Sequence, residues 1–288
     1  MAQGLTCIRV PLDTPLDLEA TLFSGQDFRW DREGDGYVGW LGDAPVLLQR
    51  APSGLVALTS LPEGEAHARL RRFLRLDDDL DAIRTALAGD GVLARCMASW
   101  PGLRLVRLEP WPALAFFLCS QHAPIPRITR MLNALAQALG EPVVFLGRER
   151  WRFPTPTAIA GAGPERLAAL RLGYRAEYLW RTACLLAQGR AHLDVLASLP
   201  TEEARRRLLA LPGVGEKVAD CVLLLGFGRT DAFPVDRWVR RALVEWYGLP
   251  PPYTERRLRA WAQERWGSLA GYAQLYLFHH RRTVHLLQ

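Results

Sequence analysis

The sequence is poor in lysine, in clustered cysteine and in long apolar runs. Lys217 is the only lysine among 36 basic residues. Five cysteines occur without any C-x-x-C pair, which excludes the compact zinc and iron–sulfur ligand patterns. No apolar run approaches the roughly 18 residues that a membrane helix needs, so no membrane partner is expected. The first residues lack a basic segment followed by an apolar one, so we expect no secretory signal and a cytoplasmic location.

The remaining composition is that of a globular protein with a basic surface. Hydrophobic residues make up 49% and charged residues 23% of 288, enough for one large or two ordinary domains. The net charge is +6, and its arginines suit phosphate contacts, as in proteins that bind nucleic acids. A GC-rich genome would also replace lysine by arginine. Because arginine has replaced lysine at nearly every position, we expect that the one remaining lysine cannot be replaced.

The hydrophobic pattern changes along the chain and predicts an α+β fold. The first sixty residues contain short, β-branched or aromatic segments separated by turn residues, which is typical of strands. From about Glu65 onward, apolar residues recur at helical spacing almost to the end. A break near Pro101 to Pro112 places the boundary between a sheet-containing domain, residues 1–105, and an all-helical domain, residues 106–288.

The segment LPGVGEKVADC, residues 211–221, predicts a helix, a Pro-Gly-x-Gly turn and a second helix. Thr201 is expected to cap the first helix, and the second is expected over residues 216–226. Gly213 and Gly215 permit a left-handed backbone and close approach, so the amides near Val214 can face one anion, such as a DNA phosphate. An ordinary turn between two helices is the alternative.

Lys217 is expected in the first turn of that second helix. The positive end of the helix dipole disfavours an ammonium there by roughly 0.3–1 kcal/mol, so a residue chosen for stability would be acidic. A nucleophilic lysine must be neutral, and both the dipole and burial favour the neutral amine. Lys217 is therefore a candidate nucleophile, with a solvated helix lysine as the alternative.

The segment FPVDRW, residues 233–238, places Asp236 before another helical stretch. A carboxylate at that position caps the helix. The same rigidly held carboxylate can also act on a substrate, and the two roles are compatible.

Several segments resemble the helix–hairpin–helix DNA glycosylases, and 8-oxoguanine DNA glycosylase in particular. The hairpin is followed by PVD, and Asp236 lies 19 residues after Lys217, as in that superfamily. Further similar segments occur in the same order along most of the chain: SGQDFRW (24–30), FFLCSQH (116–122), LGYRAEY (172–178) and AGYAQLYLF (270–278).

The resemblance implies a bifunctional glycosylase and AP lyase that acts on oxidised guanine in double-stranded DNA, as a monomer and at the bacterial nucleoid. Lys217 would attack C1′ and form a Schiff base, and Asp236 would stabilise the developing charge. It also implies a base pocket formed by Gly25, Cys221, Gln274 and Phe278. The DNA contacts that it implies are His122, Arg127, Tyr174, Arg175, Gly213, Val214 and Gly215.

The resemblance implies no cofactor, because the cysteine cluster of the endonuclease-III-like relatives is missing, although a structural cation at the hairpin is possible within the family. The chain departs from the family pattern at three positions. His122 stands where eukaryotic members have an asparagine that contacts the estranged cytosine. Trp238 replaces a histidine, and Arg281 replaces an acidic residue.

Two other functions remain open at this point. An alkylpurine glycosylase of the 3-methyladenine type shares the fold and the aspartate but uses water, and Lys217 and SGQDFRW argue against it. A non-catalytic helix–hairpin–helix module would bind DNA with a strong salt dependence and would require neither Lys217 nor Asp236. A metal-dependent nuclease lacks a clustered ligand set in this sequence.

Overall fold

The computed structural model describes residues 4–286 and contains one large antiparallel sheet near the N-terminus. Its five strands lie in the order β1-β5-β4-β3-β2, and every neighbouring pair is antiparallel. One face of the sheet is buried because alternate side chains of β1 and β5 point into the core. The strands are β1 (Thr6–Pro11), β2 (Asp31–Glu33), β3 (Gly36–Leu41), β4 (Ala44–Ala51) and β5 (Gly54–Thr59).

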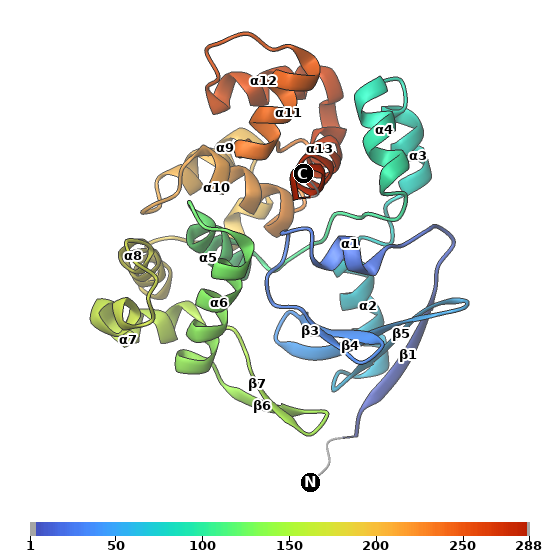
Figure 1. Cartoon of the computed structure of the whole chain (residues 1–288). Coiled ribbons are helices and arrows are strands. Elements are labelled where there is room, and N and C mark those ends of the chain that lie inside the picture. The colour runs from blue at the N-terminus through green and yellow to red at the C-terminus, as the bar shows by residue number, and fades with distance from the viewer. Residues whose placement is uncertain (1–3, 287–288) are drawn as a thin grey trace.

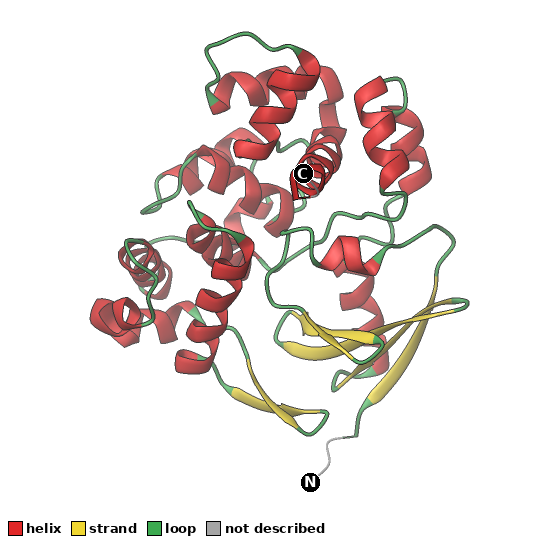
Figure 2. Cartoon of the chain, viewed as in Figure 1, coloured by secondary structure: helices red, strands yellow, loops and turns green. Residues whose placement is uncertain are grey.

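Helices make up most of the rest of the chain (Figure 2). The first four are α1 (Leu18–Leu22), α2 (Glu63–Phe73), which packs against β1 and β3, α3 (Leu80–Leu87) and α4 (Gly91–Ser99). The helices that follow are α5 (Pro110–Ser120), α6 (Ile125–Leu139), α7 (Pro156–Ala169), α8 (Arg175–Ala187), α9 (Thr201–Leu209), α10 (Glu216–Cys221), α11 (Arg237–Tyr247), α12 (Glu255–Trp266) and α13 (Ala270–Leu286). Short turns of other helix types lie at η1 (Asp194–Ala197), η2 (Val222–Gly226) and η3 (Gly267–Leu269).

The sheet and the helices share one continuous hydrophobic core. In Figure 1 the helices α5, α10 and α13 converge at the centre of the molecule, above the sheet. Helix α4 packs against α13, and the Tyr276 hydroxyl on α13 donates to the carbonyl of Leu103 at 3.2 Å. The predicted α+β fold is confirmed, whereas the boundary between residues 105 and 106 stays a prediction.

Two elements differ from the sequence-based expectation. The region predicted to be all-helical contains a hairpin of β6 (Pro142–Phe145) and β7 (Arg148–Trp151). Its two-residue turn, Leu146-Gly147, has positive φ at both positions (52° and 73°), as tight hairpin turns require. The N-terminal region predicted as strand contains α1, because the Asp17 carboxylate caps that helix by accepting from the amide of Ala20 at 2.9 Å.

Candidate active site

The hairpin before Lys217 has the predicted helix–turn–helix form. Gly213 has φ +76°, and a side chain at this position would lie 2.4 Å from the ring of Tyr178, so only glycine fits. Gly215 has an extended backbone, and nothing lies within 4 Å of the place a side chain would occupy. The two glycines thus serve different purposes: Gly213 allows the turn to fold, and Gly215 leaves its outer surface open.

Two details of this motif differ from expectation. Thr201 is the first residue of α9 rather than its cap; Pro200 occupies the cap position, and Thr201 forms no capping bond. The second helix changes form after Cys221, where α10 continues as the wider η2 turn.

Side chains from neighbouring helices hold the hairpin in place. The Gln121 amide, just after α5, donates to the carbonyl of Gly213 at 3.2 Å. The Thr182 hydroxyl on α8 donates to the carbonyl of Pro212 at 3.2 Å. The amides of the turn are thereby fixed relative to α5 and α8.

A buried charge network fixes the helix that carries Lys217. Asp220 lies between Arg205 of α9 and Arg259 of α12, with an Arg259 Nη1 to Asp220 Oδ2 distance of 3.2 Å and a close ion pair to Arg205. Arg259 also pairs with Glu216 at 2.5 Å. Burial raises the pKa of Asp220 to about 6, and the two arginines oppose that shift, so the carboxylate is charged at neutral pH. These ion pairs therefore connect α10 to α9 and to α12.

Lys217 is half-buried at the start of α10, in contact with α5. Its Nζ lies 3.1 Å from the Ser120 hydroxyl and 4.7 Å from the centre of the Phe117 ring. Among the described residues, no carboxylate forms an ion pair with this amine. An amine held by one hydroxyl and one aromatic face is available to react.

Asp236 caps α11, as predicted. Its Oδ1 accepts from the amides of Trp238 and Val239, each at 2.9 Å. Burial raises the pKa of this carboxyl, while the two amides and the nearby Lys217 charge partly offset the rise. The side chain is rigid and partly desolvated, which suits a group that acts electrostatically on a substrate.

Lys217 and Asp236 line one cavity, which is open to solvent. The predicted base-binding residues line the same cavity, although they come from three distant parts of the sequence: Gly25, Cys221, Gln274 and Phe278. Gln274 and Phe278 are four residues apart on α13, so both project from one face. Burial raises the pKa of the Cys221 thiol to about 12, so this thiol is neutral at physiological pH.

The turn that contains Gly25 enters the cavity from the N-terminal region. Gly25 has φ +93°, and a side chain there would lie 2.8 Å from Ile125 Cδ1. Gln26 fixes the turn: its amide donates to Ser24 Oγ and the carbonyl of Arg104, each at 2.9 Å, and its oxygen accepts from the amide of Val106 at 3.0 Å. The polar residues of this motif thus hold a backbone segment at the edge of the cavity.

The predicted DNA contacts beyond the hairpin lie at the ends of α5, α6 and α8. His122 and Arg127 are exposed, and His122 has a left-handed backbone with φ 48°. Tyr174 is 49% exposed, as an inserting aromatic side chain requires. Arg175 differs in that its side chain is buried and its Nε donates to the carbonyl of Gln121 at 2.9 Å, so it holds the turn before His122.

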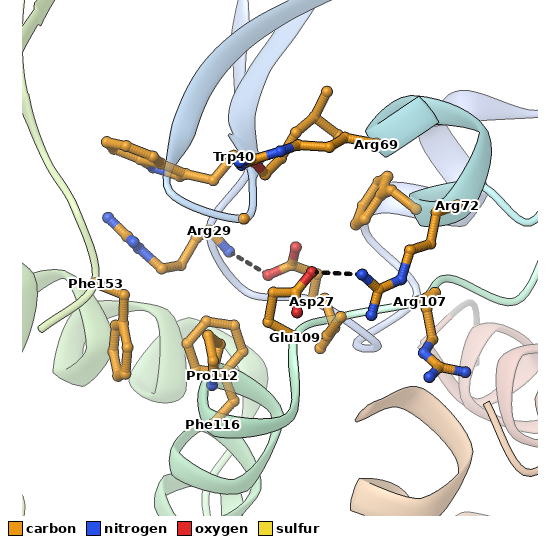
Figure 3. Close-up of a pocket in the computed structure, with 14 residues that line it drawn as sticks. Asp27, Arg29, Trp40, Arg69, Arg72, Arg107, Glu109, Pro112, Phe116 and Phe153 are labelled. Atoms are coloured by element: carbon orange, nitrogen blue, oxygen red, sulfur yellow. Dashed lines mark hydrogen bonds and ion pairs between the residues drawn. The ribbon is translucent and has the colours of Figure 1, made fainter. Parts of the chain in front are cut away.

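A second cavity lies on the other side of α5 (Figure 3). It is lined by Phe116, whereas the cavity with Lys217 is lined by Phe117. Both of its carboxylates have partners: Glu109 pairs with Arg72 at 3.1 Å, and Asp27 accepts from the indole of Trp30 at 2.9 Å. This cavity has no free nucleophile and is not a candidate for the reaction.

Within residues 4–286, no group of three or more His, Cys, Asp or Glu side chains is placed to hold a metal ion. No helix in that range is both long and apolar enough to cross a bilayer.

Comparison with known proteins supports one family. A family profile described as 8-oxoguanine DNA glycosylase, N-terminal domain, matches residues 8–114, and one described as HhH-GPD superfamily base excision DNA repair protein matches residues 116–268. A probable N-glycosylase/DNA lyase of Methanothermobacter thermautotrophicus is 30% identical across 97% of each chain. The chain belongs to the N-glycosylase/DNA lyase family.

Other relatives of this glycosylase agree with that assignment. The N-glycosylase/DNA lyase of Saccharomyces cerevisiae is 28% identical, over 91% of this chain and 82% of its own length. The 8-oxoguanine glycosylase/lyase of Clostridium acetobutylicum, solved with dsDNA containing cytosine opposite 8-oxoG, has a TM-score of 0.90 at 28% identity, covering 94% and 93% of the two chains. An Archaeoglobus fulgidus 3-methyladenine glycosylase, 21% identical with a TM-score of 0.80, shares the fold.

Two contacts of Lys217 were not predicted from the sequence of this glycosylase. Phe117 and Ser120 stand three residues apart in FFLCSQH, on the face of α5 that meets α10. The spacing was visible, but nothing local indicated that Lys217, almost a hundred residues later, would pack against them.

Proposed function

We propose that the enzyme excises 8-oxoguanine from duplex DNA through a Schiff base on Lys217 and then cleaves the strand by β-elimination. The observation that carries the proposal is that Lys217 and Asp236 line one cavity with the four residues expected to bind the base. The names of the full-length relatives, which are N-glycosylase/DNA lyases, support the reaction class.

In the proposed reaction, the neutral Lys217 amine attacks C1′ of the flipped nucleotide. The bond from C1′ to the base breaks, and the base leaves with the bonding electrons and takes up a proton. Asp236 stabilises the positive charge that develops on the sugar during this step. The ring-opened sugar forms an imine with Lys217, and loss of a C2′ proton then expels the 3′ phosphate.

The substrate enters the cavity only when it is extruded from the duplex, which costs a few kcal/mol. We propose that the hairpin amides, with Val214 between the glycines, bind the backbone while Tyr174 fills the gap left in the stack. We propose that Gly25, Gln274, Phe278 and Cys221 contact the base, and that His122, Arg127 and Arg175 lie at the opposite base.

We further propose that the amine and the carboxylate suffice without a cofactor, that the enzyme acts as a monomer, and that it works in the cytoplasm at the nucleoid. The proposed location follows from the proposed substrate, because chromosomal DNA carries the damaged base.

Borohydride trapping tests the nucleophile. We expect a covalent complex with a duplex that contains 8-oxoguanine opposite cytosine, and its complete loss in Lys217→Gln. Because Lys217 is the only lysine, the aliphatic amine that remains in the variant is the α-amino group of the N-terminus. Trapping that persists in the variant would move the Schiff base to that terminus and refute the assignment.

Two measurements complete the test. Lys217→Gln should bind a duplex with a stable abasic-site analogue with affinity similar to the wild type, which separates lost chemistry from lost binding. Duplexes with 3-methyladenine or uracil in place of 8-oxoguanine should be cleaved far more slowly; preferred excision of 3-methyladenine would indicate the alkylpurine alternative.

A further inference from the structure

Arg282 lies on the same stripe of α13 as the two cavity residues of that helix. Gln274, Phe278 and Arg282 follow at intervals of four residues, so they lie one above the other on one face. The Arg282 guanidinium carbon is 5.4 Å from the centre of the Phe278 ring. The stripe that contacts the cavity therefore ends in a cation.

The Arg282 guanidinium reaches from α13 to the turn that contains Gly25. Its Nη2 donates to the carbonyl of Phe23 at 3.1 Å. Its Nη1 would lie 3.4 Å from a side chain placed on Gly25, so the guanidinium lies directly against that glycine. Among the hydrogen bonds of residues 4–286, this is the one that joins α13 to residues 23–26.

The Gly25 turn is thus held from two sides. Gln26 connects the turn by hydrogen bonds to the segment of the N-terminal region that contains Arg104 and Val106. Arg282 ties it to the helix that carries Phe278. The distance between the backbone at Gly25 and the face of Phe278 therefore depends on this arginine.

That distance matters for recognition. 8-Oxoguanine and guanine differ at C8, which carries an oxygen in the oxidised base, and at N7, which carries a hydrogen only in the oxidised base. A hydrogen-bond acceptor placed at N7 therefore distinguishes them. A hydrogen bond weakens steeply when the acceptor moves out of line. An acceptor and a stacking ring on separate parts of the chain discriminate well only if their relative position is fixed.

The location is also costly for a cation. The Arg282 side chain is largely enclosed, and burial lowers its pKa while attraction to Asp236 opposes the decrease. A leucine would fill such a helix position at lower cost. A costly residue that contacts the site it borders indicates a role there.

We infer that Arg282 is a positioning residue that sets the preference of the pocket for 8-oxoguanine over guanine by holding the Gly25 turn against α13. This inference rests on the proposed function, in which Gly25 and Phe278 contact the base.

The test measures binding in the Lys217→Gln background, where the base stays attached. The quantity is the ratio of the Kd for a guanine–cytosine duplex to the Kd for the matched 8-oxoguanine–cytosine duplex. Arg282→Leu should lower this ratio about tenfold, the equivalent of one hydrogen bond. Affinity for a duplex with an abasic-site analogue should change less than about twofold, because that duplex has no base to position.

Arg281→Leu is the matched control. Arg281 is the next residue on α13, but it pairs with Glu245 at 2.9 Å and does not line the cavity. Its removal should leave the ratio unchanged. Arg282→Lys, which keeps the charge but not the two-pronged reach, should give an intermediate ratio and remains informative if the leucine variant unfolds.

Two results would overturn the inference. One is an unchanged ratio in folded Arg282→Leu. The other is an equal loss of affinity for the abasic and the 8-oxoguanine duplexes, which would indicate a purely structural role. A Lys217→Gln protein without any preference for 8-oxoguanine would instead overturn the proposed function itself, before any Arg282 variant is made.

Discussion

Replacing Asp236 by asparagine should stop turnover and leave the protein at least as stable as the wild type. The Asp236 carboxylate has two tasks, since its Oδ1 caps α11 and it faces the cavity with Lys217. Asparagine keeps an oxygen that can accept from the amides of Trp238 and Val239, so the cap survives. It removes a negative charge whose burial disfavours the folded state, as the raised pKa of this group indicates.

The pH dependence of this stability difference has a definite sign. Because the pKa of Asp236 is raised in the folded protein, the native state binds the proton more tightly than the unfolded chain does. The wild type therefore loses stability from this group as the pH rises from the unfolded pKa through the folded one. The stability advantage of Asp236→Asn should be near zero at acid pH, where the carboxyl is protonated, and should reach its full value at neutral pH.

Asp236→Ala separates the cap from the charge. Alanine removes both, and loss of an N-cap costs about 1 kcal/mol, within a range of roughly 0.5–2 kcal/mol. In a protein of this size each kcal/mol lowers Tm by roughly 2–4 °C. Alanine should therefore melt below asparagine at every pH, while both variants lose turnover by a similar factor of several orders of magnitude.

Calorimetry across the pH range and single-turnover excision of 8-oxoguanine measure the two effects. Retained turnover in Asp236→Asn would reduce the residue to a cap. A stability difference between asparagine and wild type that shrinks as the pH rises would refute the sign of the argument.

The hairpin and the buried network allow two further predictions. Gly213→Ala should lower Tm, because it places a Cβ against the Tyr178 ring at a position with positive φ. Gly215→Ala should leave Tm unchanged but should weaken binding to undamaged duplex, as measured by fluorescence anisotropy. Unchanged affinity of Gly215→Ala would show that phosphates do not approach the hairpin there. Asp220→Ala should cost about 3–5 kcal/mol in urea unfolding, because it removes the oxygens that Arg205 contacts and leaves that arginine buried without its partner. A loss below about 1 kcal/mol would show that the pair is dispensable.

The sequence predicted the features that depend on short segments. Hydrophobic period separated the sheet from the helices, and the residues 211–221 were sufficient for the hairpin because its shape depends on two glycines and the helices beside them. The β6–β7 hairpin was missed although Leu146-Gly147 follows the short apolar segment PVVF, because the surrounding helical period was extended across it. The local turn signal was present, but the helical periodicity of the flanking residues outweighed it.

The site itself depended on long-range packing, which no local pattern encodes. Gly25 and Phe278 are more than 250 residues apart, and only the resemblance to a known family placed both at the base. Arg175 shows the same dependence on packing, since its motif predicted a DNA contact but could not show that its guanidinium donates to the Gln121 carbonyl. Arg282 had no motif to mark it, because a single arginine on an amphipathic helix is unremarkable until its partner at Phe23 is known.

The placement of charges around α10 suggests why the chain tolerates an unfavourable arrangement at the cavity. A lysine in the first turn of a helix and a partly desolvated carboxylate each cost stability on their own. One turn away, Asp220 joins α9, α10 and α12 through two buried arginines, and none of these three side chains lines the cavity with Lys217. If the network fixes α10 rigidly, then Lys217 need not contribute to holding its own helix and can carry a residue type chosen for reactivity. The expected consequence is that Asp220→Asn slows Schiff-base formation even in molecules that remain folded. Lys217→Gln, by contrast, should leave the free energy of unfolding unchanged or increase it.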